Sequence, residues 1–479
     1  MPVSSPRRFL LNGIWTDGTL VMQITSPWNG QVIGDVFSAS IEQAKQAADA
    51  ARSSMPAMRA MTGAQRSDAL RKICSALQQR AEEIAAVIRD EVGKPMALCR
   101  AEVQRAAKTF LLGAEETLRL PGECIYPDQE TQGAGMVGRL QSFPIGPMLG
   151  ITPFNFPLNL VAHKVSPALA AACPIVIKPP PQGPTAALIL GEIVLASGFP
   201  PAALQVLPGG VEVGQALCAS DAFAVVSFTG SAKAGWAIKQ NARPRQKVLL
   251  ELGGNAAVIV DESADMELAA KAISVGAYAY AGQVCISTQR VLVHDSKIKL
   301  FTRQLPDRIS ADVRVARDAG DEKALVGPVI DVKAADRIET WSKSAQAHGA
   351  GMVVRGERVN ERLITPSLWE NVPTDEPLWS EEVFGPIAAL QSAGNFKDAV
   401  ARANASKYGL QASVFTDSLR NAEYAFRELE CGAVLINIPT AFRIDAAPYG
   451  GVKESGFGRE GVRDMVRELC EPKLMVVRP

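Results

Sequence analysis

The cysteine of the segment Gly282-Gln283-Val284-Cys285-Ile286 lies where a thiol could do chemistry. It follows a glycine that ends a predicted helix and precedes a predicted strand, and loops on a rigid frame are where proteins present reactive groups. As a thiolate, Cys285 would be a nucleophile. As a thiol packed between Val284 and Ile286, it would be a small buried apolar side chain. The segment alone leaves both interpretations open.

Two polar residues have settings that suit a nucleophilic reaction. Glu251 ends the apolar run 248–250 and precedes two glycines, so its carboxylate is either an exposed cap or a general base for water. Asn155 stands in the segment 153–157, Pro-Phe-Asn-Phe-Pro, in which the prolines fix the backbone. Its amide is either a donor to a developing oxyanion or a cap of the next helix.

Three further segments are candidates for binding. Thr229-Gly230-Ser231 follows a predicted strand and opens a predicted helix, where backbone N–H groups can receive a phosphate. Its spacing is not G-x-G-x-x-G, and no G-x-x-x-x-G-K-[ST] pattern occurs in the chain. The segment 448–460 is a glycine-rich loop or a long turn. The segment 381–386, Glu-Glu-Val-Phe-Gly-Pro, would also suit a surface acidic pair followed by a turn.

Composition excludes several classes of function. The 479 residues include 50 Lys plus Arg and 50 Asp plus Glu, so no net charge attracts nucleic acid or an acidic membrane surface. The histidines, His163, His294 and His348, are far apart, and the eight cysteines form no C-x-x-C pair, so we expect no metal site. The longest apolar stretch, 165–177, is interrupted by prolines and is shorter than the ~20 residues of a membrane span. We predict a cytoplasmic protein with reduced thiols.

Alternating strands and helices must position these residues. Capping boxes at 40–43 and 62–65 each mark a helix start, and a hairpin is predicted around Asn12-Gly13. Helices are predicted over 66–89, 97–118 and 266–281. Strands are predicted at 175–177, 204–207, 225–228, 248–252, 290–294 and 433–437, and extended chain at 133–143 and 473–477. This alternation implies parallel βαβ units.

Taken in their order along the chain, these segments resemble the aldehyde dehydrogenase superfamily. The resemblance extends from the hairpin at residues 12–13 to the glycine-rich loop near residue 455. It implies an α/β fold with two Rossmann-like lobes and a β oligomerisation extension. The dinucleotide-binding domain would comprise 1–122 and 148–252, the catalytic domain 253–455, and the extension 123–147 and 465–479. The extension would leave unpaired strand edges in a monomer, and the resemblance implies that these edges pair across subunits in a homodimer or homotetramer.

The resemblance implies that Cys285 is the nucleophile, which attacks the aldehyde carbon to give a thiohemiacetal. The side-chain amide of Asn155 and the backbone N–H of Cys285 would hold the oxyanion. After hydride transfer to a nicotinamide, Glu251 would activate the water that hydrolyses the thioester to the free acid.

The cofactor site follows from the same resemblance. Lys178 would contact the adenosine ribose, Gly230 and Ser231 the pyrophosphate, Glu382 the nicotinamide ribose, and Phe384 the nicotinamide. Further positions implied for the cofactor site are Pro153, Phe154, Pro181, Gly214 and Leu252.

Two positions depart from the family pattern. Many NAD-preferring members have a Glu three residues after the lysine, where this chain has Pro181. Without a carboxylate to repel a 2′-phosphate, and with Lys178 to attract one, we expect NADP to be accepted as well as NAD. Tyr280 stands where the family often has Asn, which bears on local packing and not on the nucleophile.

The segment 283–287, Gln-Val-Cys-Ile-Ser, is similar to the branch of lactaldehyde and non-phosphorylating glyceraldehyde-phosphate dehydrogenases. This similarity implies a small polar or anionic aldehyde as substrate. The candidate substrate contacts are Phe156, His163, Val284, Ile286 and Arg443. A satisfied helix histidine and a solvated loop arginine are the alternatives for His163 and Arg443.

Three other functions are open on the sequence. A coenzyme A-acylating dehydrogenase of the same fold commonly lacks the water-activating carboxylate, so Glu251 argues against it. A thiol esterase or hydrolase would need a histidine partner, and none can be assigned. A non-catalytic descendant would be expected to lose Cys285, Glu251 or Asn155, and all three are present.

Overall fold

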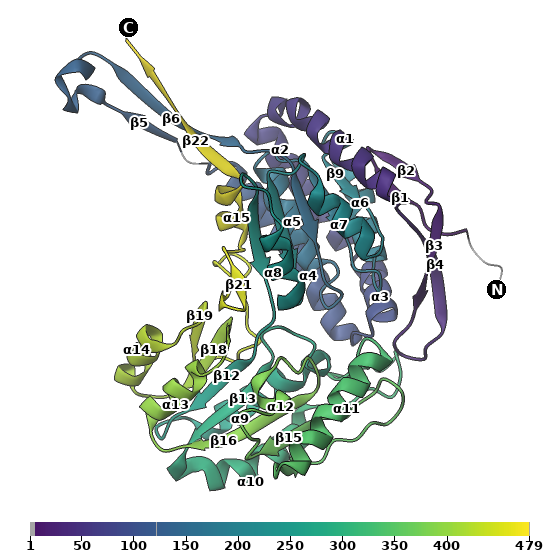
Figure 1. Cartoon of the computed structure of the whole chain (residues 1–479), viewed down its shortest axis with the longest axis vertical. Helices are drawn as coiled ribbons and strands as arrows, with labels where there is room; N and C mark the ends of the chain where they lie inside the picture. Colours follow the sequence, from purple (N-terminus) through teal and green to yellow (C-terminus); the bar gives the residue numbers. More distant parts are fainter. Residues whose placement is uncertain (1–4, 121, 479) are drawn as a thin grey trace.

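The computed structural model describes residues 5–120 and 122–478. Residues 1–4, 121 and 479, which fall in the predicted domain ranges, lie outside the described part. Two α/β lobes lie one above the other, and a long β arm projects from the upper lobe (Figure 1).

The first lobe is built on an eight-stranded sheet in the order β2-β1-β9-β8-β7-β10-β11-β21. Its strands are β1 (Phe9–Leu11), β2 (Ile14–Thr16), β7 (Met148–Ile151), β8 (Ile175–Lys178), β9 (Leu204–Val206), β10 (Val225–Thr229), β11 (Lys247–Glu251) and β21 (Gly456–Phe457). Strands β7 to β11 run parallel. Their carboxyl ends therefore share one edge, which is where open α/β sheets bind ligands. The hairpin predicted at residues 12–13 and the four strands predicted here are confirmed.

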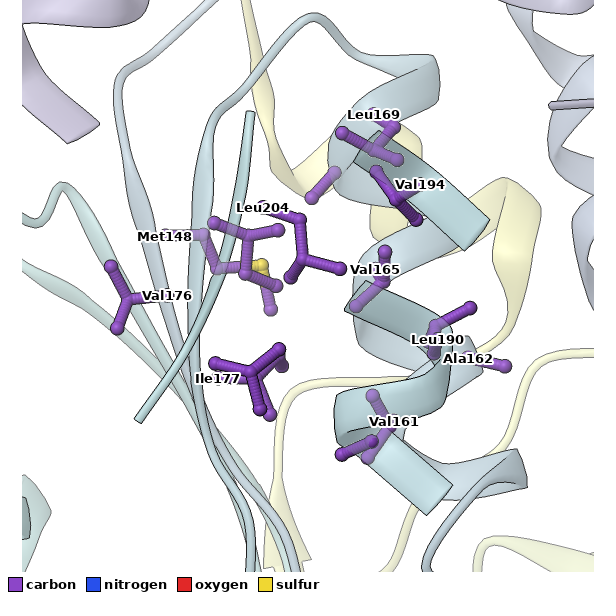
Figure 2. Packing of buried hydrophobic residues seen from close by; sticks show 14 of the residues in the cluster. Met148, Val161, Ala162, Val165, Leu169, Val176, Ile177, Leu190, Val194 and Leu204 are labelled. Carbon is purple, nitrogen blue, oxygen red and sulfur yellow. The ribbon is translucent and has the colours of Figure 1, made fainter. Parts of the chain in front are cut away.

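The core of this lobe lies between the sheet and helices α5 (Asn159–Ala170) and α6 (Thr185–Ala196). Every residue of α5 is buried. Figure 2 shows Val161, Val165 and Leu169 of α5 on the side of the sheet toward which Ile177 points, whereas Val176 points to the opposite side. Both faces of β8 are covered, which explains its continuous apolar sequence.

The remaining helices of this lobe are α1 (Ile41–Ala60), α2 (Gly63–Gln79), α3 (Ala81–Val92), α4 (Met96–Thr117), α7 (Val211–Ala219) and α8 (Ala232–Gln240). Both predicted capping boxes are present, Ser40 with Gln43 before α1 and Thr62 with Gln65 before α2. The helix predicted over 97–118 is confirmed as α4.

The single helix predicted over 66–89 is wrong. The chain turns at Arg80 (φ −99°, ψ 18°), and α2 and α3 form in its place. The apolar spacing continues across the turn, with Leu77 and Ile84 both buried, so the pattern does not reveal the break.

The second lobe is built on a seven-stranded sheet in the order β14-β15-β16-β13-β12-β18-β19, in which only β14 runs antiparallel to its neighbour among the described strands. Its strands are β12 (Ala256–Val260), β13 (Thr288–His294), β14 (Gly351–Val354), β15 (Ser367–Glu370), β16 (Ile387–Ala393), β18 (Gln411–Phe415) and β19 (Ala433–Ile436). Its helices are α9 (Met266–Tyr278), α10 (Asp295–Asp312), α11 (Val332–Ala347), α12 (Pro377–Ser380), α13 (Phe396–Asn404) and α14 (Leu419–Glu428). The helix predicted over 266–281 ends early, at Tyr278, and a 3-10 turn, η3 (Ala279–Gly282), follows it.

The loop 448–460 ties the lobes together. Within it, β20 (Val452–Lys453) pairs with β17 (Tyr408–Gly409), and β21 pairs with β11 of the first sheet. Helix α15 (Val462–Glu468) then leads to the last strand.

The arm is a three-stranded antiparallel sheet in the order β22-β6-β5, made of β5 (Gly122–Ile125), β6 (Val137–Pro144) and β22 (Cys470–Val477) (Figure 1). The 3-10 turns η1 (Pro127–Gln129) and η2 (Thr131–Gly133) connect β5 to β6, and a separate hairpin joins β3 (Leu20–Thr25) to β4 (Val32–Ser38). The segments predicted to be extended therefore pair with each other. The domain boundaries given above stay a prediction.

Within the described ranges, no helix is both long and apolar enough to pass through a membrane. In the same residues, His, Cys, Asp and Glu side chains form no group of three or more that could hold a metal ion.

Candidate active site

A cavity of about 520 Å³ lies between the two lobes and is lined by residues of both. It gathers most of the residues that the sequence singles out. The predicted residues that line it are Pro153, Phe154, Asn155, Phe156, Gly230, Ser231, Glu251, Leu252, Val284, Cys285, Ile286, Glu382, Phe384 and Arg443. The predicted residues that do not line it are Lys178, Pro181, Gly214 and His163.

The loop that carries Cys285 is held in an unusual backbone conformation. Tyr280, Ala281 and Gly282 all have positive φ, at 54°, 53° and 68°. A side chain on Gly282 would collide with the Gly385 carbonyl, so glycine is required there. A positive φ strains the backbone of Tyr280 more than it would strain that of Asn. Burial and a 2.9 Å hydrogen bond from the Tyr280 hydroxyl to the Val92 carbonyl hold the residue in place.

The Cys285 thiol faces the phenol of Tyr449, with 3.2 Å between Sγ and the hydroxyl oxygen. Burial raises the pKa of the thiol to about 11. The hydrogen bond from Tyr449 and the positive charge of Arg443 act in the opposite direction, whereas the carboxylates of Glu382 and Glu251 raise the pKa further. A reactive thiol here needs groups that favour its charged form.

Glu251 is placed as the last residue of β11, and its side chain is buried. Its Oε2 has no hydrogen-bond partner among the described residues. Burial raises the pKa of this carboxyl well above its usual range, and the negative charge of Glu460 raises it further. A carboxylate with a raised pKa is a better proton acceptor near neutral pH.

Asn155 is not a helix cap in this structure. Its side-chain Nδ2 donates to the carbonyl of Gln283, two residues before Cys285, at 3.0 Å. The first free N–H groups of α5, those of Leu158 and Asn159, instead donate to Glu102 Oε1 at 2.9 and 3.1 Å. Nδ2 carries two hydrogens, so one remains for a ligand in the cavity.

The opposite end of the cavity is shaped by backbone and aromatic rings. Glu382 Oε1 accepts a hydrogen bond from the Gly254 N–H at 3.1 Å, and burial raises the pKa of Glu382 to about 7. Phe384 packs edge-on against Phe154, with ring centroids 5.9 Å apart. A side chain on Gly253 would collide with the Glu382 carboxylate, so this cradle depends on glycine.

Lys178 and Gly214 lie outside the cavity, at the edge of the first sheet formed by the carboxyl ends of its parallel strands. Lys178 ends β8 and is nearly buried, and burial lowers its pKa to about 8. Gly214 lies in α7, which follows the neighbouring strand β9, and a Cβ added there would meet open space. Pro181 is exposed in the loop after Lys178. This edge and the cradle at Gly253 fit a dinucleotide that extends from the cavity along the carboxyl ends of the strands.

His163 does not reach the cavity, which corrects its assignment as a candidate substrate contact. It lies fully buried in α5, and its Nε2 is 2.9 Å from Asp445 Oδ1. Burial lowers its pKa to about 4. Asp445 in turn accepts two hydrogen bonds from Arg105, at 2.7 and 3.1 Å, so His163 acts on the cavity only through these residues.

Arg443 is not the solvated loop arginine that was the alternative for it. Its side chain is only 7 % exposed, and its Cζ lies 3.8 Å from the centroid of the Tyr449 ring. Nε and Nη2 have no hydrogen-bond partner among the described residues, although Nη2 is 3.5 Å from Glu460 Oε2. Arg105 lines the same wall of the cavity.

Comparison with known proteins decides the family. Residues 15–475 match the sequence model of the Aldehyde dehydrogenase family. The chain belongs to the aldehyde dehydrogenase family. It is 36 % identical over 468 residues to a 3-sulfolactaldehyde dehydrogenase of Priestia megaterium, covering 98 % of this chain and 97 % of the relative. It is 35 % identical to an NADP-dependent glyceraldehyde-3-phosphate dehydrogenase of Streptococcus equinus, covering 97 % of each.

Among solved structures, aldehyde dehydrogenase 21 of Physcomitrella patens, in complex with the reaction product succinate, superposes with a TM-score of 0.95. It is 37 % identical and 99 % of each chain is covered. The predicted family and fold class are confirmed. So is the prediction of an enzyme that oxidises an aldehyde with NAD or NADP.

Among the residues of this aldehyde dehydrogenase's cavity wall that sequence reasoning missed are Arg105, Tyr449 and Glu460. It also missed Lys164, which does not line the cavity but contacts a residue that does. Lys164 and Glu460 form a buried ion pair of 2.6 Å between α5 and the loop before α15. Tyr449 and Glu460 stand within the segment 448–460 that the sequence singles out, but only the fold shows which of its residues face the thiol. Arg105 and Lys164 lie in helices and carry no local signal.

Proposed function

We propose that this aldehyde dehydrogenase oxidises a small anionic aldehyde to the free acid through a covalent intermediate on Cys285. The observation that carries the proposal is the buried Arg443 guanidinium, which lines the cavity with two nitrogens lacking hydrogen-bond partners. Buried donors of this kind are costly unless a ligand satisfies them.

The first step takes place at the sulfur. The Cys285 thiolate attacks the aldehyde carbon and forms a C–S bond, and the carbonyl oxygen gains the negative charge. The free hydrogen of Asn155 Nδ2 and the backbone N–H of Cys285 are the donors for this oxyanion. Donors fixed before the reaction stabilise charge as it develops, which lowers the barrier.

The second step needs a nicotinamide cofactor, which when bound accepts the hydride from the substrate carbon. Glu382 and Phe384 would hold its nicotinamide half, and Gly230 and Ser231, at the start of α8, would hold the pyrophosphate. The hydride leaves with its electron pair, so the carbon attached to Cys285 is oxidised to a thioester.

The third step is hydrolysis. Glu251 removes a proton from water, the hydroxide attacks the thioester, and the thiolate of Cys285 is released. The carboxylate shares the cavity with the thiol, which supports release of a free acid over transfer to coenzyme A. A thiol hydrolase is not supported, because no histidine is among the described residues that line the cavity.

Charge at the cavity wall supports an anionic substrate. Arg443 and Arg105 both line it, but Arg105 donates from Nε and Nη2 to Asp445, so Arg443 is the guanidinium whose Nε and Nη2 groups lack a hydrogen-bond partner among the described residues. A guanidinium binds carboxylate, sulfonate or phosphate through paired N–H groups. The relatives named above act on sulfolactaldehyde and glyceraldehyde 3-phosphate or bind succinate, and all three molecules are anionic.

The test compares aldehydes of similar size with and without an anionic end, such as succinic semialdehyde and butanal, by the absorbance of reduced nicotinamide. We expect kcat/KM to be about a hundredfold higher for the anion. Arg443→Met should raise KM for the anion about tenfold or more and leave the neutral aldehyde unchanged. Equal effects on both aldehydes would exclude the anionic substrate class.

Three finer features are proposed with this function. NADP is accepted alongside NAD, because the position that often carries a carboxylate in NAD-preferring members is Pro181 and Lys178 is nearby in the chain. The arm pairs across subunits in a homodimer or homotetramer, since β22 leaves an exposed apolar edge at 474–477. The setting is cytoplasmic, which the eight unpaired cysteines support.

A further inference from the structure

One hydrogen bond connects the nucleophile to a residue that has no part in the steps above. Cys285 Sγ and the Tyr449 hydroxyl are 3.2 Å apart. Tyr449 comes from the loop 448–460, whereas Cys285 precedes β13, so the contact depends on the packing of two distant segments.

We propose that Tyr449 is a further catalytic residue, whose phenol donates a hydrogen bond to the Cys285 thiolate and so keeps the nucleophile in its reactive form. The proposal rests on the nucleophilic role proposed for Cys285. When the S–H bond breaks, the proton passes to solvent and the electron pair stays on sulfur.

The direction of this hydrogen bond follows from chemistry. A neutral thiol and a phenol can each donate to the other, but a thiolate has no hydrogen and can only accept. Once Cys285 is deprotonated, Tyr449 must be the donor. Burial raises the pKa of Tyr449 well above its usual value, so the phenol keeps its proton over the working pH range.

The charged groups facing the sulfur explain why such a donor is needed. Glu251, at the end of β11, and Glu382, after α12, both oppose a negative charge on Cys285. Arg443 favours it, but the nearby carboxylates of Glu460 and Asp445 share that charge. Tyr449 favours the thiolate without adding a charge of its own.

Tyr449 is held rigidly enough for this role. Its N–H and carbonyl form a pair of backbone hydrogen bonds with Glu460, at 2.7 and 2.6 Å. Its ring packs with Ile286 and Leu410, and the Arg443 guanidinium lies over the ring at 3.8 Å. A cation above the ring draws electron density from the phenol and makes it a stronger donor. The residue that would bind the substrate's anionic end thus also touches the residue that holds the nucleophile.

The experiment measures alkylation of Cys285 by iodoacetamide across pH in the full-length protein without substrate. Mass spectrometry of the peptide that contains Cys285 separates it from the seven other cysteines. In Tyr449→Phe, which removes only the hydroxyl, we expect the midpoint pH of alkylation to rise by about one unit. Below the midpoint, the rate should fall about tenfold. Tyr424→Phe, in α14 and outside the cavity lining, is the matched control and should not move the midpoint.

A second variant works in the opposite direction. Placing 3-fluorotyrosine at position 449 keeps the hydroxyl and strengthens it as a donor, so the midpoint should fall. This variant also keeps the proposal testable if Tyr449→Phe does not fold. In turnover assays, Tyr449→Phe should lower kcat/KM at neutral pH, and the deficit should shrink as the pH rises past the new midpoint.

The outcomes separate this proposal from the proposed function. If Cys285 is alkylated with the same midpoint in wild type and both variants, Tyr449 has no such role, although Cys285 can still be the nucleophile. If Cys285→Ser retains aldehyde oxidation, the proposed function fails, and the role of Tyr449 fails with it.

Discussion

Buried charges around Arg443 line the end of the cavity proposed for the substrate, called the substrate end below. Backbone, glycines and open space shape the end proposed for the cofactor, called the cofactor end. At the substrate end, Arg443 and Glu460 lie 3.5 Å apart with almost no exposure to solvent. At the cofactor end, the Gly254 N–H donates to Glu382, and beyond the cavity Gly214 borders open space. Charges in a low dielectric interact strongly and need fixed partners. A backbone cradle instead gives shape, and its selectivity depends on a few exposed side chains.

Glu251 lines the cavity, and replacing it should have the largest effect on turnover. In Glu251→Gln, the thioester should still form, because thiol activation is assigned to the substrate end, but its hydrolysis should slow about a thousandfold. Rapid mixing should show a burst of about one reduced nicotinamide per active site, followed by slow turnover. Glu262→Gln, an exposed neighbour on the chain, serves as the control.

Loss of the burst in Glu251→Gln would contradict the assignment of thiol activation to the substrate end. It would mean that the carboxylate acts before hydride transfer, as the base that deprotonates Cys285. The two ends of the cavity would then share one base, and the thiolate would not depend on the groups around Tyr449.

Buried His163 should make the free energy of unfolding depend on pH. Its pKa is about 4 in the folded protein, because of burial, against ~6.5 in an unfolded chain. Between these values the unfolded state binds more protons, so the free energy of unfolding falls as the pH decreases from about 6.5 to 4. This contribution is fully present above pH ~6.5 and amounts to about 3 kcal/mol across the window.

The measurement is urea unfolding of wild type and His163→Gln at several pH values. The variant should be less stable at neutral pH and should lack this part of the pH dependence. His294→Asn, at the half-buried N-cap of α10, should keep the wild-type slope. If the free energy of unfolding depended on pH in the same way in His163→Gln as in wild type, the buried pair of His163 and Asp445 would not be the source of this pH dependence.

The same contrast explains what could be predicted from the sequence. Gly230, Ser231, Glu382 and Phe384 stand in short segments whose residue types carry a signal, and all four line the cavity, while their roles toward the cofactor stay a prediction. Arg105, which lines the cavity, and Lys164, which pairs with the lining residue Glu460, carry no such signal. Both come from helices whose apolar periodicity says nothing about polar partners far away in the chain.

His163 was misassigned for that reason. A histidine in an apolar helix looks the same whether it faces a cavity or a buried aspartate, and Asp445 is 282 residues further along the chain. The helix break at Arg80 was missed on different grounds, because one apolar face continues through both α2 and α3. Contacts between segments far apart in the chain determine both the environment of His163 and the helix break at Arg80.

Pro181 offers the mildest change and tests the cofactor end alone. A carboxylate placed there by Pro181→Glu would repel a 2′-phosphate and accept hydrogen bonds from ribose hydroxyls, so the ratio of kcat/KM with NADP to that with NAD should fall about tenfold. Pro181→Gln, of equal size and without charge, is the matched control and should change the ratio much less. Because Pro181 is exposed and lies outside the cavity, neither variant should alter the preference for anionic over neutral aldehydes. A shift in that preference would mean that the two ends are coupled, and that the open edge of the sheet contributes to the buried charges across the cavity.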